Sequence, residues 1–412
     1  MKKRFFQIAL LLIFPVVITW GLWTSSAVAL TDEQSLLGEA WRIVNLAYVD
    51  DSFNHQNWWF MRQNLIKKPL KNREETYSTI KEMLASLDDP FTRLLKPEQY
   101  RNLQVDTSGE LTGVGLQIAL DPQTGELTVI SPLEGSPAEA AGIQARDRIL
   151  KIDGQATTEF TLDEAANRMR GKVGSSVVLT IFRESSDEPQ DIKLIRDKIE
   201  INPVYAELKS NSETGLIGYI RLSQFNANAT AEIRQAVENF EQQGAIGYVL
   251  DLRNNPGGLL QAGIEIARLW LDEGTIVYTV NRQRVLGSFI ASDSAITSAP
   301  LVVLTNQGTA SASEILAGAL QDNGRALLVG QKTFGKGLIQ SLFDLSDGAG
   351  LAVTVARYET PNHTDINKQG ISPDVLVEQE PIFPNQITTE ADKQYQAAVE
   401  LLKSEVVLAN VA

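Results

Sequence analysis

Residues 301–324 read LVVLTNQGTASASEILAGALQDNG, and this stretch decides the fold of the largest part of the chain. Its first four residues are apolar, which predicts a short buried strand. A polar loop follows, and small and apolar residues from Ser311 to Leu320 predict a helix that ends at Asn323-Gly324, a typical C-terminal cap. A strand that runs through a short loop into a helix is the unit from which α/β domains are built.

Similar units precede this stretch. Apolar strands are expected at 217–222 and 246–251, and each is followed by a predicted helix, at 229–243 and 259–270. Because strands and helices alternate in this way, we assign residues 200–380 to one α/β layered domain.

The chain between the leader and this domain, and the chain after it, divide into three parts. Residues 30–105 carry apolar side chains at steps of three and four, which predicts a small helical domain. Residues 106–199 form short strands separated by Gly and Pro, with one helix at 161–170, which predicts a compact β-rich domain. Residues 381–412 contain a predicted helix at 391–402 and could pack on the N-terminal domain. The fold class is therefore multidomain α+β.

The first 29 residues have the layout of a secretory signal peptide. They combine a positive start at residues 2–4, an apolar run at 5–23, and the small residues Ala27 and Ala29 of an A-x-A cleavage site. We therefore expect an exported protein that is cleaved after Ala29. The apolar run is also close to the shortest that spans a bilayer, so an uncleaved membrane anchor is the alternative.

Composition argues against several functional classes. The chain of 412 residues has a formal net charge of -14, so its surface repels nucleic-acid phosphates. It has no cysteine, which excludes disulfides, thiolate metal sites and cysteine nucleophiles. The histidines are His55 and His363 alone, so a histidine-dependent triad or a histidine-rich metal site is poorly supplied. We expect no metal and no cofactor.

Ser311 stands where the predicted loop meets the predicted helix. A hydroxyl there is exposed above the strand end, and unpaired backbone N–H groups at the helix start can stabilise a developing oxyanion. The same residues also form a capping box, in which Ser311 caps the helix and Glu314 reaches back. The local sequence by itself favours the cap, and Ser313 is a rival hydroxyl.

Two further stretches could supply chemistry. Lys336 lies between two glycines in Phe334-Gly-Lys-Gly337, inside an otherwise apolar region. A lysine withdrawn from water loses its proton more readily and can act as general base to a serine; the alternative is a solvated lysine in a glycine turn. In Asp251-Leu-Arg-Asn-Asn-Pro-Gly-Gly258, two glycines can bring N–H groups close to a ligand. They would form part of an oxyanion hole only if they lie against Ser311.

Four blocks of residues together resemble the C-terminal processing, or tail-specific, peptidases. The blocks are Asp251–Gly258, Gly308-Thr-Ala-Ser-Ala-Ser-Glu-Ile315, Thr333-Phe-Gly-Lys-Gly337 and Gly370-Ile-Ser-Pro-Asp374. The resemblance extends over almost the whole chain after the leader. It implies a serine endopeptidase with a crotonase-like (ClpP/crotonase-type) α/β core, which removes C-terminal extensions from other proteins without a cofactor.

The resemblance also implies roles for individual residues. The implied roles are the nucleophile for Ser311, the general base for Lys336, a supporting role for Gln340, and oxyanion donors at the N–H groups of Gly257 (or Gly258) and Ala312. The order and spacing of the blocks also match the family: Lys336 lies 25 positions after the first serine of Ser-Ala-Ser, and this spacing assigns the nucleophile role to Ser311 rather than Ser313.

Residues 106–199 resemble a PDZ domain. The residues Gly113, Val114, Gly115 and Leu116 stand where such domains hold a terminal carboxylate in backbone N–H groups, beside a groove that accepts the peptide as an added strand. Arg168 and Arg170, on the helix beside this groove, are further candidates for contact with the substrate tail; the alternative is that one or both are simply solvated. Tail specificity would follow from this groove.

Short stretches of the N-terminal region, such as Leu87-Asp-Asp-Pro-Phe-Thr-Arg93, resemble the photosynthetic branch of the family. This implies action in the thylakoid lumen or periplasm on the precursor of the photosystem II reaction-centre D1 protein. The alternatives are a general tail-specific quality-control protease and an inactive PDZ-bearing binding protein. A coenzyme A enzyme, suggested only by the crotonase-like core, is disfavoured by export. We expect no nucleic acid as partner, and membrane contact only through an uncleaved signal or a membrane-bound substrate.

Overall fold

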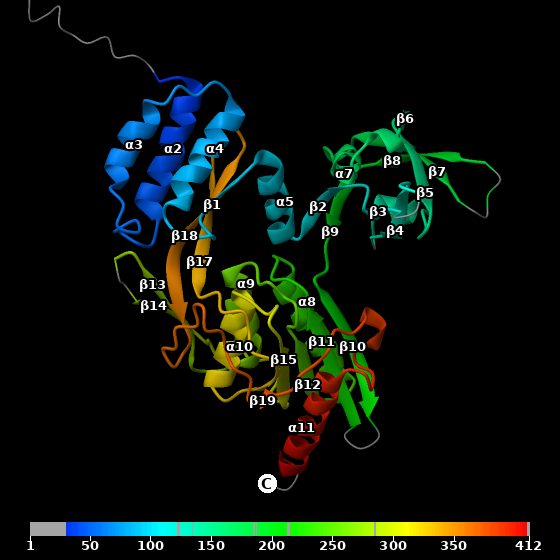
Figure 1. Ribbon diagram of the computed structural model, residues 1–412. Coiled ribbons are helices and arrows are strands. Elements are labelled where there is room, and N and C mark those ends of the chain that lie inside the picture. Colours follow the sequence, from blue (N-terminus) through cyan, green and yellow to red (C-terminus); the bar gives the residue numbers. More distant parts are fainter. Residues whose placement is uncertain are drawn as a thin grey trace, which may run out of the picture. The chain divides into compact units, whose positions relative to one another are not determined.

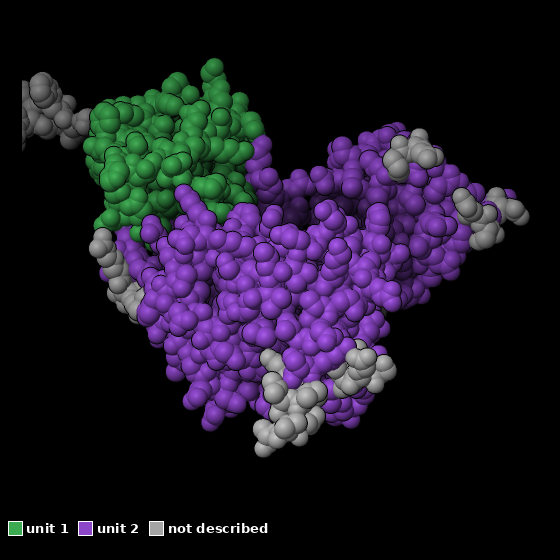
Figure 2. Space-filling view, turned by 60° about the horizontal axis from the view of Figure 1, so that its bottom comes forward, with its two compact units in different colours: residues 1–95, 342–353 green, residues 96–341, 354–412 purple. Residues whose placement is uncertain are grey.

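The structure is a computed structural model that describes residues 30–121, 124–133, 135–183, 186, 188–211, 215–283 and 286–409 (Figure 1). The predicted signal peptide and its cleavage after Ala29 lie outside these residues. Two compact units are formed (Figure 2): one holds the chain up to Leu95 with Leu342–Val353, and the other holds Lys96–Ser341 and the chain from Thr354 onward. Within the described ranges, no helix is both long and apolar enough to span a bilayer.

The first unit is built on three helices, as the apolar spacing predicted. They are α2 (Asp32–Ala47), α3 (Trp58–Ile66) and α4 (Arg73–Ala85). Each begins at a polar side chain that accepts a hydrogen bond from its first turn, which satisfies one N–H group that the helix leaves unpaired. The apolar stripes face inward, with Leu36, Leu37, Ala40, Val44, Ile80, Met83 and Leu84 all buried.

A segment far along the chain completes this unit. Strand β1 (Arg93–Leu95) pairs antiparallel with the start of β18 (Gly350–Glu359). The Tyr77 hydroxyl of α4 donates to the Asp347 carboxylate at 2.7 Å, and burial together with this bond raises the pKa of Tyr77 to about 12. Residues 342–353 lie within the range 200–380 predicted for the α/β domain, and they pack with the N-terminal helices because strand pairing joins residues that no local pattern relates.

The second unit contains the β-rich domain predicted for residues 106–199. Its antiparallel sheet consists of β3 (Leu116–Leu120), β4 (Leu127–Pro132), β5 (Arg148–Ile152), β6 (Gln155–Ala156), β7 (Ser176–Phe182) and β8 (Gln190–Ile195). The helices α6 (Pro137–Ala140) and α7 (Leu162–Met169) share its separate apolar core. Around this sheet lie α5 (Pro97–Ser108) and the paired strands β2 (Glu110–Gly113) and β9 (Asp197–Glu200).

The α/β layer of the second unit is a six-stranded sheet. In order, its strands are β10 (Val204–Asn211), β11 (Gly215–Leu222), β12 (Ala245–Asp251), β15 (Leu301–Thr305), β16 (Leu327–Gly330) and β19 (Val375–Leu376). Within this sheet, β11, β12, β15, β16 and β19 run parallel to one another, and β10 is antiparallel to β11. The carboxyl ends of the parallel strands therefore meet at one edge, which is where ligands bind in such sheets.

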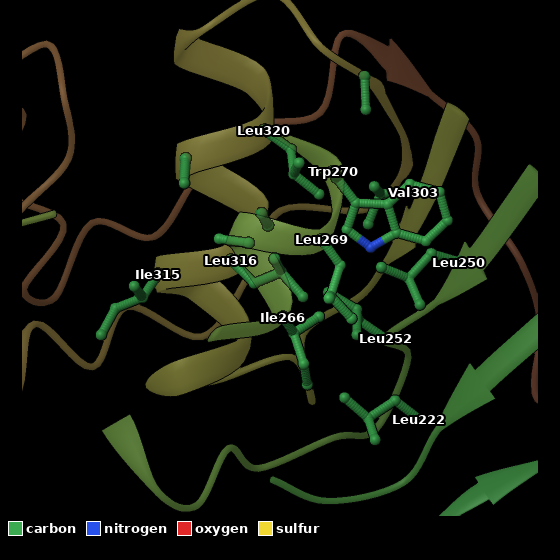
Figure 3. Packing of buried hydrophobic residues seen from close by; sticks show 14 of the residues in the cluster. Leu222, Leu250, Leu252, Ile266, Leu269, Trp270, Val303, Ile315, Leu316 and Leu320 are labelled. Carbon is green, nitrogen blue, oxygen red and sulfur yellow. The ribbon is translucent and has the colours of Figure 1, made fainter. Parts of the chain in front are cut away.

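Three helices cover one face of this sheet. They are α8 (Ala229–Gln242), α9 (Leu260–Trp270) and α10 (Ala312–Asp322). Their apolar residues share one core with alternate residues of the strands, including Leu250 of β12 and Val303 of β15 (Figure 3). Because neighbouring strand residues point to opposite faces, Val249 and Val302 belong to the core on the other side.

Helix α11 (Lys393–Ala409) covers that other face. Its residues Tyr395, Ala398 and Leu402 are buried against apolar side chains of the sheet. The prediction that the C-terminal segment packs on the N-terminal domain was therefore wrong. The helix pattern shows that one side must be covered, whereas the covering surface is set by strands distant in sequence.

A smaller set of strands frames the loop that contains Lys336. Strand β13 (Thr275–Asn281) pairs with β14 (Leu286–Ile290) and with the later residues of β18. Strand β17 (Leu338–Asp344) begins directly after the loop and also pairs with β18. Strand pairing therefore fixes one end of the Lys336 loop.

Candidate active site

Ser311 lies at the junction between β15 and α10, as the sequence predicted. Its backbone has φ +58° and ψ −117°, a conformation that costs a non-glycine residue roughly 1–3 kcal/mol. The Ser311 N–H donates to the Glu314 carboxylate at 2.9 Å, and the Tyr358 hydroxyl donates to the Ser311 carbonyl at 3.1 Å. Burial and the nearby Glu314 carboxylate raise the pKa of Tyr358, so this hydroxyl keeps its proton.

The two serines of Ser-Ala-Ser have different surroundings. Ser313 is fully buried, and its hydroxyl donates to the Asn255 carbonyl at 3.0 Å, which gives it a structural role. Ser311 is only half-buried and begins the helix through its backbone, because its carbonyl accepts from the N–H groups of Glu314 at 2.8 Å and Ile315 at 3.0 Å. Of the two candidate nucleophiles, Ser311 is therefore the accessible one.

Glu314 has a larger role than the capping role that the sequence predicted. It is fully buried, and it accepts hydrogen bonds from Ser311 N–H and Lys336 N–H, both at 2.9 Å and both at Oε2. Its Oε1 accepts from the Thr333 hydroxyl at 2.5 Å and from Gly335 N–H at 2.7 Å. One carboxylate thus holds the serine junction and the lysine loop together. The available signal was a glutamate in an otherwise small and apolar helix, which we interpreted only as a capping residue.

The lysine loop is shaped by its glycines. Gly335 has φ +90°, and a Cβ there would lie 2.8 Å from the backbone nitrogen of Gly370. At Gly337 a Cβ would lie 2.8 Å from the backbone nitrogen of Asn367. The Thr333 hydroxyl accepts from Ile371 N–H at 2.7 Å. The block at 370–374 therefore supports the loop from outside the site, and glycine is required because the two backbones touch.

Gly257 lies against Ser311, as an oxyanion hole requires. It has φ +95°, and a Cβ there would lie 2.9 Å from both the Ser311 Cβ and the Ala312 nitrogen. Its N–H donates to the Asn255 side-chain oxygen at 2.9 Å in this structure. An oxyanion would have to replace this amide. A Cβ at Gly258 would instead collide with the Phe225 carbonyl, so Gly258 serves close packing on Phe225.

Gln340 lies on β17, four residues after Lys336. Its amide donates to the Thr354 hydroxyl at 3.4 Å, a long hydrogen bond to the neighbouring strand β18. Thr354 is buried, so this contact limits the positions open to the Gln340 side chain. The supporting role that resemblance implies for Gln340 remains a proposal.

A second buried ionic group follows β12. The Arg253 guanidinium donates to Asp251 at 2.9 and 2.7 Å and to Asp392 at 2.8 Å through each of two nitrogens. Burial disfavours the Arg253 cation, but its bonds to Asp392 and Asp251 outweigh burial and raise its pKa. Asp392 also caps the start of α11 through Tyr395 N–H at 3.1 Å. The group therefore fastens the C-terminal helix to the sheet.

The predicted tail-binding loop borders a cavity of about 60 Å³ in the β-rich domain. Gly113, Val114, Gly115 and Leu116 all line it, beside Ala166 and Met169 of α7. Arg168 does not: it is exposed, and its guanidinium stacks 4.2 Å from the centre of the Phe160 ring. Arg170 lines the cavity instead and donates to Asn102 at 2.7 Å. The helix periodicity turns Arg168 away because Ala165 and Met169 occupy its buried side.

In the described part of the chain, no three histidine, aspartate or glutamate side chains are grouped so that they could hold a metal ion. The groups that the structure brings together at the Ser311 junction are a hydroxyl, the main chain of the Lys336 loop, and N–H groups at the start of α10 and at Gly257. This arrangement, on an α/β sheet with an attached β-rich domain, defines the class of serine-type peptidases.

Comparison with known proteins gives the family. The family model for Peptidase family S41 matches residues 216–377, and the model for the PDZ domain matches residues 128–183. A carboxyl-terminal-processing protease of Synechocystis sp. is 60% identical over 99% of this chain and 95% of its own length. Carboxyl-terminal-processing peptidase 2, chloroplastic, of Arabidopsis thaliana is 47% identical over 86% of this chain and 69% of its own length.

A solved structure gives the same result. The photosystem II D1 C-terminal processing protease superposes with a TM-score of 0.56 at 45% identity, over 84% of this chain and 94% of that one. The chain therefore belongs to peptidase family S41 and is a C-terminal processing protease. The PDZ domain and the α/β protease core that the sequence predicted are confirmed.

Proposed function

We propose that Ser311 and Lys336 form the catalytic dyad of this protease. The observation that carries the proposal is the buried Glu314 carboxylate, which accepts from the backbone N–H groups of both residues. Because both main chains are tied to one rigid group, their side chains start from fixed and neighbouring positions. Fixed geometry of this kind is what proton transfer from a hydroxyl to an amine needs.

The reaction then follows from the groups around Ser311. The neutral Lys336 amine, supported by Gln340, takes the hydroxyl proton as Ser311 attacks the scissile carbonyl. The N–H groups of Gly257 and Ala312 stabilise the oxyanion, once Gly257 N–H has exchanged the Asn255 side chain for it. Lys336 returns the proton to the leaving amine, and water hydrolyses the acyl-enzyme with Lys336 again as base.

The substrate is the C-terminal tail of another protein. In this proposal the tail adds as a strand beside the cavity of the PDZ domain, with its carboxylate on the loop Gly113–Leu116. The D1 precursor of photosystem II is the favoured substrate, because the solved relative at 45% identity is described as a D1 processing protease. The leader predicted for residues 1–29 and the chloroplastic relative support action after export, in the thylakoid lumen or periplasm.

Cleavage of a precursor-like polypeptide tests these assignments. The mature protein is incubated with a substrate that ends in a free carboxylate or in an amide, and Ser311→Ala and Lys336→Ala serve as variants. We expect loss of a C-terminal fragment only from the free-carboxylate substrate, and only with both residues intact. Equal cleavage of both substrates would remove tail recognition. An active Lys336→Ala enzyme at neutral pH would remove the base assignment.

The same experiment separates the alternatives. Comparable cleavage of many unrelated free-carboxylate tails would favour a general quality-control protease. Binding of the tail without any cleavage would favour a PDZ-bearing binding protein.

A further inference from the structure

Phe334 is an apolar side chain that the fold leaves in water. The residue is 58% exposed, although it stands between Thr333 and Gly335 in the lysine loop. No ring or cation stacks on it among the described residues. An exposed phenylalanine is ordinary by itself, but this one occupies a loop whose other parts are tied to the active site.

The loop cannot easily move to bury the ring. Phe334 N–H donates to the Thr309 carbonyl at 3.0 Å, and the flanking Thr333 and Gly335 donate to the buried Glu314 carboxylate at 2.5 and 2.7 Å. The backbone of Phe334 is therefore held from both sides and from its own nitrogen. The ring is presented to solvent by a rigid frame.

The hydrogen bond to Thr309 brings the Phe334 backbone next to the segment that leads into Ser311. Phe334 precedes Lys336 by two residues, and its hydrogen-bond partner Thr309 precedes Ser311 by two residues. A substrate chain whose scissile carbonyl reaches Ser311 must pass close to both segments. We expect its neighbouring side chains to meet the exposed Phe334 ring there.

We propose that Phe334 is a specificity-determining residue, whose ring packs against an apolar substrate side chain within two residues of the scissile bond. This inference rests on the proposed Ser311–Lys336 dyad and adds the substrate class: an aliphatic side chain such as leucine is favoured over serine. Contact with the ring removes apolar surface from water on both partners, and such contacts discriminate by about 10-fold or more.

Peptide cleavage tests the inference. A tail peptide that the enzyme cleaves is prepared with Leu or Ser at each of the two positions on either side of the cut. For each position, kcat/KM of the Leu peptide is divided by that of the Ser peptide. We expect this ratio to be about 10 or more at one position for the unaltered enzyme. It should fall to about 1 in Phe334→Ser and stay near the original value in Phe334→Leu.

Ile290→Ser is the matched control, since Ile290 is 57% exposed and lies on β14 of the same unit. It should leave the ratio unchanged. A ratio near 1 at every position in the unaltered enzyme, or an unchanged ratio in Phe334→Ser, would overturn the inference while the dyad stands. An equal fall in kcat/KM for the Leu and Ser peptides in Phe334→Ser would overturn it as well, because the ratio would then be unchanged. If the unaltered enzyme cleaves no tail peptide from which this series could be made, the proposed function fails and this inference fails with it.

Discussion

Two buried ionic clusters lie at the carboxyl ends of neighbouring strands, and they hold different things. The Arg253 cluster (Asp251, Arg253, Asp392) pairs one guanidinium with two carboxylates. The Glu314 cluster (Ser311, Glu314, Lys336, with Thr333 and Gly335) surrounds one carboxylate with four neutral donors, three of them backbone N–H groups.

The difference lies in which atoms are engaged. In the Arg253 cluster the charged side chains bond to one another, and the backbone N–H groups of Arg253 and Tyr395 that donate to them belong to the two segments being fastened. In the Glu314 cluster the carboxylate bonds to the main chains of Ser311 and Lys336, whose side chains form the dyad proposed above. Buried carboxylates accept backbone N–H groups in both places, but only in the Glu314 cluster do those N–H groups belong to the two residues of the proposed dyad.

The largest effect should come from breaking the Arg253 cluster. In Arg253→Met, two buried carboxylates lose their shared cation, and we expect the free energy of unfolding to fall by about 3–5 kcal/mol. Urea unfolding followed by circular dichroism measures it. Arg234→Met is the control, because Arg234 is well exposed and its ion pair with Glu238 is 3.8 Å long. A variant of Arg253 as stable as the control would mean that the cluster does not fasten α11.

Breaking the Glu314 cluster should act mainly on catalysis. Each oxygen of the native Glu314 carboxylate accepts from two donors. In Glu314→Gln, the amide nitrogen therefore faces two donors in either orientation of the side chain. We expect displacement of Ser311 or Lys336 and a loss of about 100-fold in kcat/KM. Glu238→Gln, on the exposed face of α8, should retain full activity. Near-normal turnover by Glu314→Gln would contradict the positioning role of the carboxylate.

The smallest expected effect is on how the free energy of unfolding changes at acid pH. Asp392 is buried, which by itself raises its pKa, but its bonds to Arg253 outweigh burial and lower the pKa below the usual value. A carboxyl with a lowered pKa in the folded state stabilises above its unfolded pKa, and this contribution disappears as pH falls through the folded pKa. Asp392→Asn should therefore be less stable at pH 7 by about 1–3 kcal/mol, with the difference shrinking below about pH 4.

Unfolding of both proteins at a series of pH values from neutral to acid measures that difference. A difference that stays constant down to acid pH would show that Asp392 acts through its shape and helix cap rather than through its charge.

Sequence reasoning went furthest where structure is local. The strand, loop and helix of 301–324 depend on neighbouring residues, and β15 and α10 confirm them. The family resemblance placed Ser311, Lys336 and Gly257 in one site, and the structure brings Gly257 against Ser311 and ties Lys336 N–H to Glu314. Burial also separated the two serines, which the local sequence could not do.

What escaped prediction depends on distant contacts. Asp392 is 139 residues from its partner Arg253, and no spacing rule relates them. The choice between Arg168 and Arg170 depended on which side of a short helix is buried, and one residue of phase decides it. Asn255, whose side-chain oxygen accepts a hydrogen bond from Gly257 N–H, looked like an ordinary loop residue.

The pairing of β1 with β18 has a consequence for synthesis. Contacts between residues 93–95 and 350–352 have very high sequence separation, and contacts of that kind form late because a long loop must close first. The N-terminal helices leave the ribosome early but stay without their last strand until more than 250 further residues have followed. The first unit to be made is therefore among the last to be finished, and a chain cut short before Leu342 would leave β1 as an open edge.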